Sequence, residues 1–210
     1  MAGPPLNGTK RKEETEQRRS AILDAARTVF ARQGYAKTVV EDIANQAGIA
    51  KGTLYLYFRS KEQIYLATLM ENCTEVNRQS AAAMAAAKTW QEKLRAFIDV
   101  RLRSLDQPEQ QDFFRVYLTE FRNVCMVQQA GAVEMSQMVQ DSETQLVQML
   151  AVAIDRGEIR PVDPALTASV ISDLTRGLIE RRLRAWGRGA NPGDEEQVLD
   201  LLCRALQRVN

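Results

Sequence analysis

Apolar residues recur at the spacing of an α-helix along almost the whole chain, and this feature limits the possible folds more than any other. In the stretches 18–34 and 132–157, for example, apolar side chains follow one another at intervals of three or four residues and a glycine ends each stretch. A β-hairpin is typically announced by alternating β-branched residues bounded by turn residues, and the sequence has no such run. The sequence therefore predicts an all-α fold.

The predicted helices form a short N-terminal group and a longer C-terminal group. Residues 1–17 are polar and start with Gly and Pro, so we expect a flexible arm there. Residues 18–61 predict three helices, the last two of them short, arranged as a helix-turn-helix domain. Residues 62–210 predict longer helices that pack as a helical bundle.

Charge is distributed unevenly between these groups. The formal net charge is only +1, but residues up to Lys61 carry +5 and the remainder carries −4. The low total charge argues against a protein that coats nucleic acid without specificity. A basic N-terminal part on an acidic body indicates that the N-terminal part meets phosphate.

Several classes of protein are disfavoured by what the sequence lacks. It has no histidine, no Glu-x-x-His pair, no phosphate-binding glycine loop and no Gly-x-Ser-x-Gly turn, so we expect no enzyme, no metal site and no cofactor.

Cys73, Cys125 and Cys203 lie far apart, which predicts reduced thiols in the cytoplasm. We find no leader and no apolar run near the roughly 18 residues of a membrane span, and expect no membrane partner.

The segment 38–58 has the spacing of two short helices joined near Gly48. The residues expected to face the interior are apolar: Ile43, Ala44, Leu54 and Phe58. The residues expected on the outer face of the second helix are small, polar or aromatic: Lys51, Gly52, Thr53, Tyr55 and Tyr57. In a helix-turn-helix the second helix enters the DNA major groove, so this outer face is the candidate DNA-binding surface.

The stretch 34–65, GYAKTVVEDIANQAGIAKGTLYLYFRSKEQIY, resembles the N-terminal signature of the TetR family of bacterial regulators. The resemblance covers about residues 18–66; beyond them only length, helical content and helix order are similar. It implies a homodimeric transcriptional regulator, with residues 62–210 as effector-binding and dimerisation domain. We expect a repressor released from a palindromic DNA operator by a small, mostly apolar effector. A DNA-occluding protein of the same fold without an effector is the alternative.

The resemblance also implies roles for single residues. Thr38 would cap the first helix of the motif, a role that its position three residues before a glutamate also favours. The outer face would meet DNA, and Lys61 would meet a phosphate. The sequence departs from the family at three positions: Val39 replaces a usual Ser or Thr, Ala50 a usual Ser cap, and Leu56 a frequent aromatic or His. Base choice at Leu56 would then depend on apolar contact.

An effector pocket is expected among the middle helices, where aromatic and methionine side chains are frequent. The candidates for its lining are Phe97, Arg101, Phe113, Phe114, Tyr117, Phe121, Met126, Met135, Met138 and Met149. The candidates for orienting a polar group are charged: Asp173 with Arg176, and Glu120 with Arg122. The same spacing also fits an ordinary helical core and solvated ion pairs, so both interpretations stay open.

The last two predicted helices are more apolar than one-sided packing in a small domain requires. The leucines expected at a dimer interface recur at helical spacing: Leu174, Leu178, Leu202 and Leu206. Such helices favour a four-helix bundle across a two-fold axis. An intramolecular core is the alternative.

Overall fold

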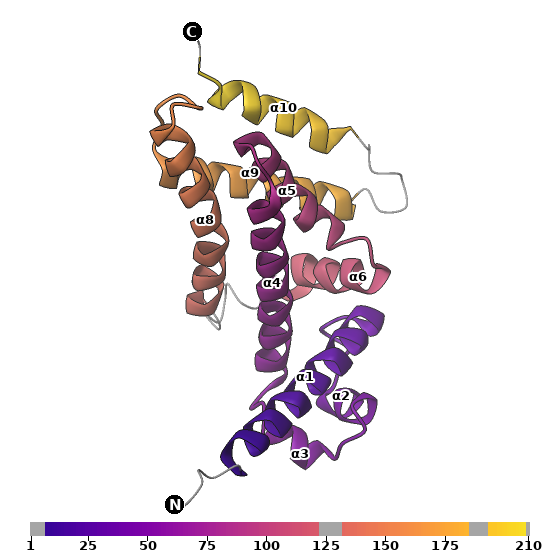
Figure 1. Cartoon of the computed structure of the whole chain (residues 1–210). Helices are drawn as coiled ribbons and strands as arrows, with labels where there is room; N and C mark the ends of the chain where they lie inside the picture. Colours follow the sequence, from indigo (N-terminus) through magenta and orange to yellow (C-terminus); the bar gives the residue numbers. More distant parts are fainter. Residues whose placement is uncertain (1–6, 122–131, 185–192, 209–210) are drawn as a thin grey trace, which may run out of the picture. The chain divides into compact units, whose positions relative to one another are not determined.

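The computed structural model describes residues 7–121, 132–184 and 193–208 (Figure 1). Every regular element in these ranges is a helix, and the strand-like pairing found there is an isolated bridge between Ile159 and Gln207. The prediction of an all-α fold is confirmed. In the same ranges, none of the helices combines the length and the apolar character that crossing a membrane requires.

The chain divides into two compact units, which we call the head and the body. The head lies within residues 1–71 and 112–131, and the body within 72–111 and 132–210. Helix α4 (Lys61–Ala86) contributes to both units. The head is thus larger than the range 18–61 expected from the sequence, because the start of α4 and the segment after residue 112 share its core. The separate functions predicted for 18–61 and 62–210 remain predictions.

The head contains α1 (Asn7–Gln33), α2 (Val40–Gln46), α3 (Lys51–Tyr55), most of α6 (Pro108–Val116) and the π-helical turn η1 (Tyr117–Phe121). Helix α1 begins at Asn7, so the prediction of a flexible arm is wrong for residues 7–17. These residues are mostly Lys, Arg, Glu and Gln, which favour helix. They extend a helix that is anchored further along by the buried Ile22 and Phe30.

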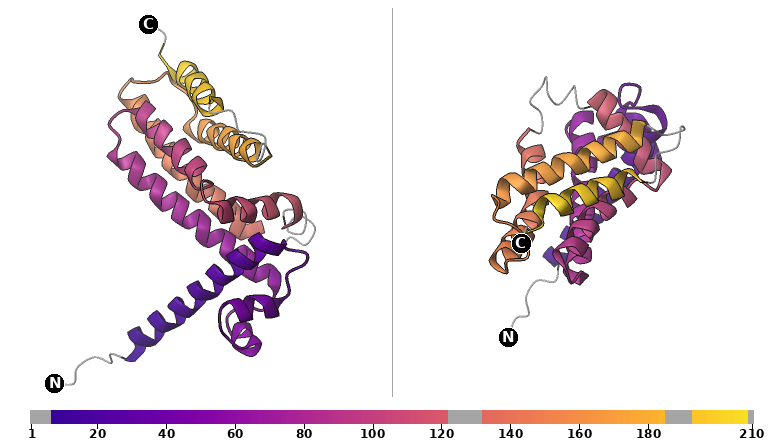
Figure 2. Two further views of the ribbon diagram at one scale, coloured as in Figure 1. Left: turned by 90° about the vertical axis from the view of Figure 1, so that its right-hand side faces the viewer. Right: turned by 90° about the horizontal axis from the view of Figure 1, so that it is seen from above.

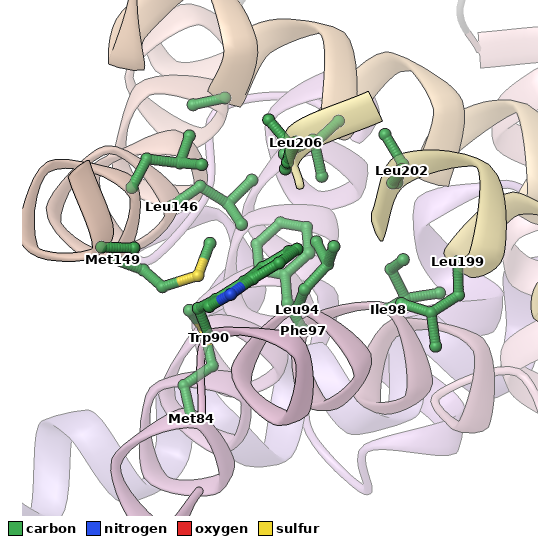
Figure 3. Packing of buried hydrophobic residues seen from close by; sticks show 14 of the residues in the cluster. Met84, Trp90, Leu94, Phe97, Ile98, Leu146, Met149, Leu199, Leu202 and Leu206 are labelled. Carbon is green, nitrogen blue, oxygen red and sulfur yellow. The ribbon is translucent and has the colours of Figure 1, made fainter. Parts of the chain in front are cut away.

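The body contains α5 (Trp90–Arg103), α8 (Ala132–Asp155), α9 (Pro164–Arg184) and α10 (Asp194–Leu206), together with the rest of α4. Helix α5 starts at a capping box: Thr89 Oγ1 accepts from Glu92 N (3.2 Å) and the Glu92 carboxylate accepts from Thr89 N (3.1 Å). Helix α10 runs back alongside α9 (Figure 2). The helices enclose one apolar core, part of which is shown in Figure 3.

Candidate nucleic-acid interface and effector site

Helices α2 and α3 form the helix-turn-helix expected from the sequence. The turn passes through Gly48, whose φ of 65° lies in the left-handed region that glycine adopts without strain. Its backbone is closed by a hydrogen bond from Ile49 N to Ala44 O (3.0 Å). The four residues predicted to face the interior are all buried: Ile43, Ala44, Leu54 and Phe58. The two helices are therefore fixed against each other by packing as well as by the turn.

The outer face of α3 lies at the surface of the head. Lys51, Gly52 and Tyr55 are exposed, Tyr55 to 45%, while Thr53 and Tyr57 are half-buried. Leu56, directly after α3, is 83% exposed, the most exposed of the large apolar side chains described. The surface thus offers an amine, an aromatic ring with a hydroxyl, and an aliphatic group.

Lys51 already has partners within the motif. Its ammonium forms an ion pair with Glu41 of α2 and lies 5.9 Å from the centroid of the Tyr55 ring. The hydrogen bond between the two side chains lowers the pKa of Glu41 and raises the pKa of Lys51, so the pair stays charged at neutral pH. Contact with a DNA phosphate therefore means exchanging one exposed anionic partner for another.

The predicted cap of α2 is wrong. Val39 occupies the N-cap position and provides no side-chain bond, whereas the Thr38 hydroxyl donates backward to Gly34 O at 2.6 Å. Thr38 is only 1% exposed. The carboxylate of Asp42 accepts from Val39 N (3.4 Å) and so supplies part of the capping. Contact between Thr38 and DNA stays a prediction, and the burial of its side chain weighs against it.

Lys61 lies against the loop that connects α1 to α2. Its Nζ donates to Tyr35 O and to Thr38 O, each at 2.9 Å, and lies 4.4 Å from the centroid of the Tyr35 ring. The Tyr35 hydroxyl in turn donates to Glu62 Oε1 at 2.8 Å. The start of α4 is thereby tied to the loop before the motif. The predicted phosphate contact of Lys61 has to compete with these internal contacts.

Four aromatic rings form the centre of the head: Phe30, Tyr35, Tyr65 and Phe113. Tyr65 is fully buried, stacks on Phe113 with ring centroids 4.8 Å apart, and donates its hydroxyl to Phe113 O at 2.9 Å. Phe113, a predicted pocket residue, is therefore a core residue of the head. Phe114 packs edge-on against it at 6.1 Å, and Tyr117 is half-buried in η1.

Glu120, a predicted effector contact, instead holds the loop after α1. Its Oε2 accepts from Ala36 N at 2.8 Å, and its Oε1 lies 2.8 Å from where a Cβ on Gly34 would stand. Gly34 has a φ of 81°, a conformation that favours glycine, whereas the Glu120 carboxylate is the end of a flexible side chain and can move aside for a Cβ. The close approach of a carboxylate to this turn had no signal in the sequence.

The remaining predicted pocket residues are scattered. Phe97, Arg101 and Met149 are buried in the body, whereas Asp173 is exposed and ion-paired with Arg176. Figure 3 shows Phe97 and Met149 in the apolar core beside Trp90 and Leu146. The other predicted members lie outside the described side chains: Phe121, Arg122, Met126, Met135 and Met138. Across the described residues, no cluster of three potential metal ligands occurs.

The leucines predicted at a dimer interface face the interior of the body. Leu178, Leu202 and Leu206 are buried in its apolar core, and Leu174 packs against that core. Because they are buried within a single chain, three of these four have little surface left for a partner. Other apolar residues of the same helices are exposed: Leu166 and Val170 on α9 and Leu201 on α10.

Comparison with known proteins agrees with the geometry of the head. The family model described as bacterial regulatory proteins, tetR family, matches residues 22–68. The HTH-type transcriptional regulator RutR of Escherichia coli (strain K12) is 30% identical over 165 residues, covering 74% of this chain and 70% of RutR. The HTH-type transcriptional regulator YfiR of Bacillus subtilis is 27% identical over 180 residues, covering 82% of this chain and 83% of YfiR.

A solved structure extends the similarity to the body. The transcriptional regulator FadR from Bacillus subtilis, in complex with stearoyl-CoA, superposes with a TM-score of 0.68 and 26% identity. The superposition covers 87% of this chain and 96% of that chain. The similarity therefore includes the helices of the body as well as the DNA-binding motif.

Proposed function

The chain belongs to the TetR family of bacterial transcriptional regulators, and we propose that it is a homodimeric repressor that binds a palindromic operator and is released by a small effector. The observation that carries the proposal is the surface of α3. A short helix, fixed by buried Leu54 and Phe58, exposes Lys51, Tyr55 and the adjoining Leu56 to solvent. Such a helix is long enough to read only a few base pairs, so specific binding needs two copies.

We assign different roles to the side chains of this surface. Lys51 contacts phosphate once it exchanges Glu41 for DNA. Tyr55 and Leu56 contact base edges, where an aliphatic group such as Leu56 favours the methyl group of thymine. A Cβ on Gly52 would meet nothing within 4 Å in the free protein, so packing within the head does not require glycine at this position. The absence of a side chain there leaves room for DNA to approach the backbone of α3. Thr38 and Lys61 position the motif from behind.

Dimerisation is proposed to use α9 and α10, through residues other than those predicted. Leu166 and Val170 lie one turn apart on α9, and Leu201 lies on the neighbouring α10. All three are exposed in the single chain. Burying apolar side chains of this size contributes about 1.5–3 kcal/mol each when burial is complete. A two-fold axis doubles the number of buried residues.

An effector is proposed to bind in the body and to act through α4, which belongs to both units. The FadR relative in complex with stearoyl-CoA supports an effector with an apolar portion. A ligand shifts the balance between DNA-bound and released states only through its different affinities for them. Couplings of about 1–3 kcal/mol correspond to a loss of operator affinity of roughly 5- to 150-fold.

The test is selection of bound DNA from a random-sequence library, followed by affinity measurements on the selected duplex. We expect enrichment of a palindrome whose half-sites lie about one helical turn or more apart. Enrichment of a single half-site, or of no motif, would contradict a dimeric sequence-specific repressor. A ligand that raises the melting temperature without changing operator affinity would instead favour a DNA-occluding protein that no effector releases.

A further inference from the structure

Arg101 of α5 is a charged residue buried in the body, with only 7% of its surface exposed. Its Nη1 donates to Ser80 Oγ (2.7 Å) and Phe97 O (3.1 Å), and its Nη2 to Asn77 Oδ1 (2.9 Å) and Ser142 Oγ (2.8 Å). These acceptors come from α4, α5 and α8. All four are neutral, so they satisfy the hydrogen bonds of the guanidinium group without compensating its charge.

The charge of Arg101 has no anionic partner among the residues that the structure describes. Other arginines of the same unit differ: the exposed Arg95 pairs with Glu196 (2.8 Å) and the half-buried Arg182 with Asp106 (2.6 Å). The Cys73 thiol is not a counter-ion either, because burial raises its pKa to about 12, although Arg101 opposes the shift. Of these three arginines, Arg101 is therefore the one that lacks a carboxylate partner.

Burying an unpaired charge is energetically unfavourable, and the pKa of Arg101 reflects this. Loss of water around the guanidinium group lowers its pKa to about 9. A methionine or leucine in the same place would pack at lower cost if the site served only to fill the core. The polar cluster is also incomplete: Gln145 donates to Asn77 O (2.9 Å) but its own Oε1 is buried without a partner.

Aromatic and apolar groups lie directly beside the charge. The guanidinium carbon of Arg101 is 3.5 Å from the centroid of the Phe97 ring, a cation–π contact that stabilises the charge in part but supplies no counter-ion. Phe97 belongs to the apolar core with Leu94, Leu146 and Met149, which Figure 3 shows around it. All four of these apolar side chains are buried in the single chain, so a ligand bound at Arg101 contacts them only after core side chains move apart.

We propose that Arg101 binds the anionic group of a small amphipathic ligand, a carboxylate or a phosphate ester, whose apolar portion packs against Phe97 and its neighbours. The inference rests on the proposed effector function of the body and narrows it from a mostly apolar ligand to an anionic one. The planar guanidinium fork matches the two oxygens of a carboxylate or phosphate. Asn77 and Ser142 are only half-buried, so an anion arriving from their side exchanges places with two neutral acceptors.

The experiment compares ligands that differ only in charge. Decanoate and decanamide form one pair, and 2-naphthoate and 2-naphthamide form a second pair with a different apolar body. Binding to the full-length protein is measured by isothermal titration calorimetry and by the shift in melting temperature. A hydrogen-bonded ion pair of about 1.5–3 kcal/mol predicts that at least one acid binds roughly 10- to 100-fold more tightly than its amide. Equal affinities within both pairs, or no binding of any probe, would overturn the proposal.

Two variants test whether Arg101 causes the tighter binding of the acid than of its amide. Arg101→Met keeps the aliphatic part of the side chain, removes the guanidinium group and is expected to abolish the difference between acid and amide. Arg95→Met is the matched control, because Arg95 is an exposed arginine on the same helix and the preference should survive there. An acid preference that persists in Arg101→Met would refute the assignment. If Arg101→Met fails to fold, the comparison of acid and amide binding to the wild-type protein still tests the proposal.

A titration with the selected operator separates this inference from the proposed function. If an acid binds through Arg101 but leaves operator affinity unchanged, the anion site stands and the effector function fails. If a ligand releases operator but acid and amide act equally, the effector function stands and the anion site fails.

Discussion

Replacing Lys61 with methionine tests whether this side chain holds the head together or contacts DNA. Its Nζ donates to two backbone carbonyl oxygens at 2.9 Å and lies over the Tyr35 ring. The amine of Lys61 therefore connects the start of α4 to the loop between α1 and α2. Methionine retains most of the aliphatic length and loses both bonds. Lys37→Met is the matched control, since Lys37 is an exposed lysine in the same loop.

The expected loss of stability follows from those contacts. A hydrogen bond to a charged group contributes about 1.5–3 kcal/mol, and the half-buried position of Lys61 places both bonds at the low end. The contact with the Tyr35 ring adds about 0.5–1 kcal/mol. We expect Lys61→Met to lower the free energy of unfolding by about 3.5–4 kcal/mol. With a typical urea m-value of about 2 kcal/mol/M, the midpoint falls by about 2 M.

Two assays on the same samples separate the alternatives. Urea unfolding followed by circular dichroism gives the stability, and fluorescence anisotropy with a duplex at several salt concentrations gives the salt slope. We expect a destabilised protein whose folded form keeps the wild-type salt slope. A phosphate contact predicts the reverse, with wild-type stability and a slope shallower by about 0.9. That reverse result, with Lys37→Met unchanged in both assays, would refute the structural role.

Two further predictions concern the surfaces of the head and of the body. Glu41→Gln removes the anionic partner of Lys51 and one negative charge beside the outer face of α3; we expect tighter binding to any duplex and a steeper salt dependence, and weaker binding would contradict the proposed exchange of partners. A charge at the proposed dimer surface, in Val170→Glu or Leu201→Glu, is expected to give folded monomers in sedimentation, whereas Val152→Glu, also exposed but on α8, should remain dimeric. Dimers in all three variants would place the interface elsewhere.

The helix-turn-helix was predictable from the sequence because its determinants are local. Apolar spacing identified Ile43 and Leu54 as interior residues, and Gly48 identified the turn. The cap of α2 was mispredicted because the competing partner of Thr38 is the Gly34 carbonyl, while Lys61 binds the Thr38 carbonyl from outside the motif. The bond from Thr38 to Gly34 is a local contact that competes with the cap, whereas the bond from Lys61 comes from tertiary packing that capping patterns do not describe.

The predicted pocket and dimer surface show what apolar spacing leaves undetermined. Phe113 and Phe97 look equivalent in the sequence, yet Phe113 stacks on Tyr65 in the head and Phe97 lies in the core of the body. Likewise, Leu202 and Leu201 are adjacent leucines of α10, of which Leu202 is buried and Leu201 exposed. A helical stripe indicates that a face is covered, but not which element covers it.

The most direct test of the account is the affinity of a Lys51→Ala, Tyr55→Ala double variant for the operator selected from a random library. Losing one phosphate contact and one base contact is expected to cost about 3 kcal/mol, which raises Kd roughly 100-fold. Lys88→Ala, which removes an exposed lysine from the body, is the control and should bind as the wild type does. Unchanged operator affinity in the folded double variant would show that the outer face of α3 does not read DNA.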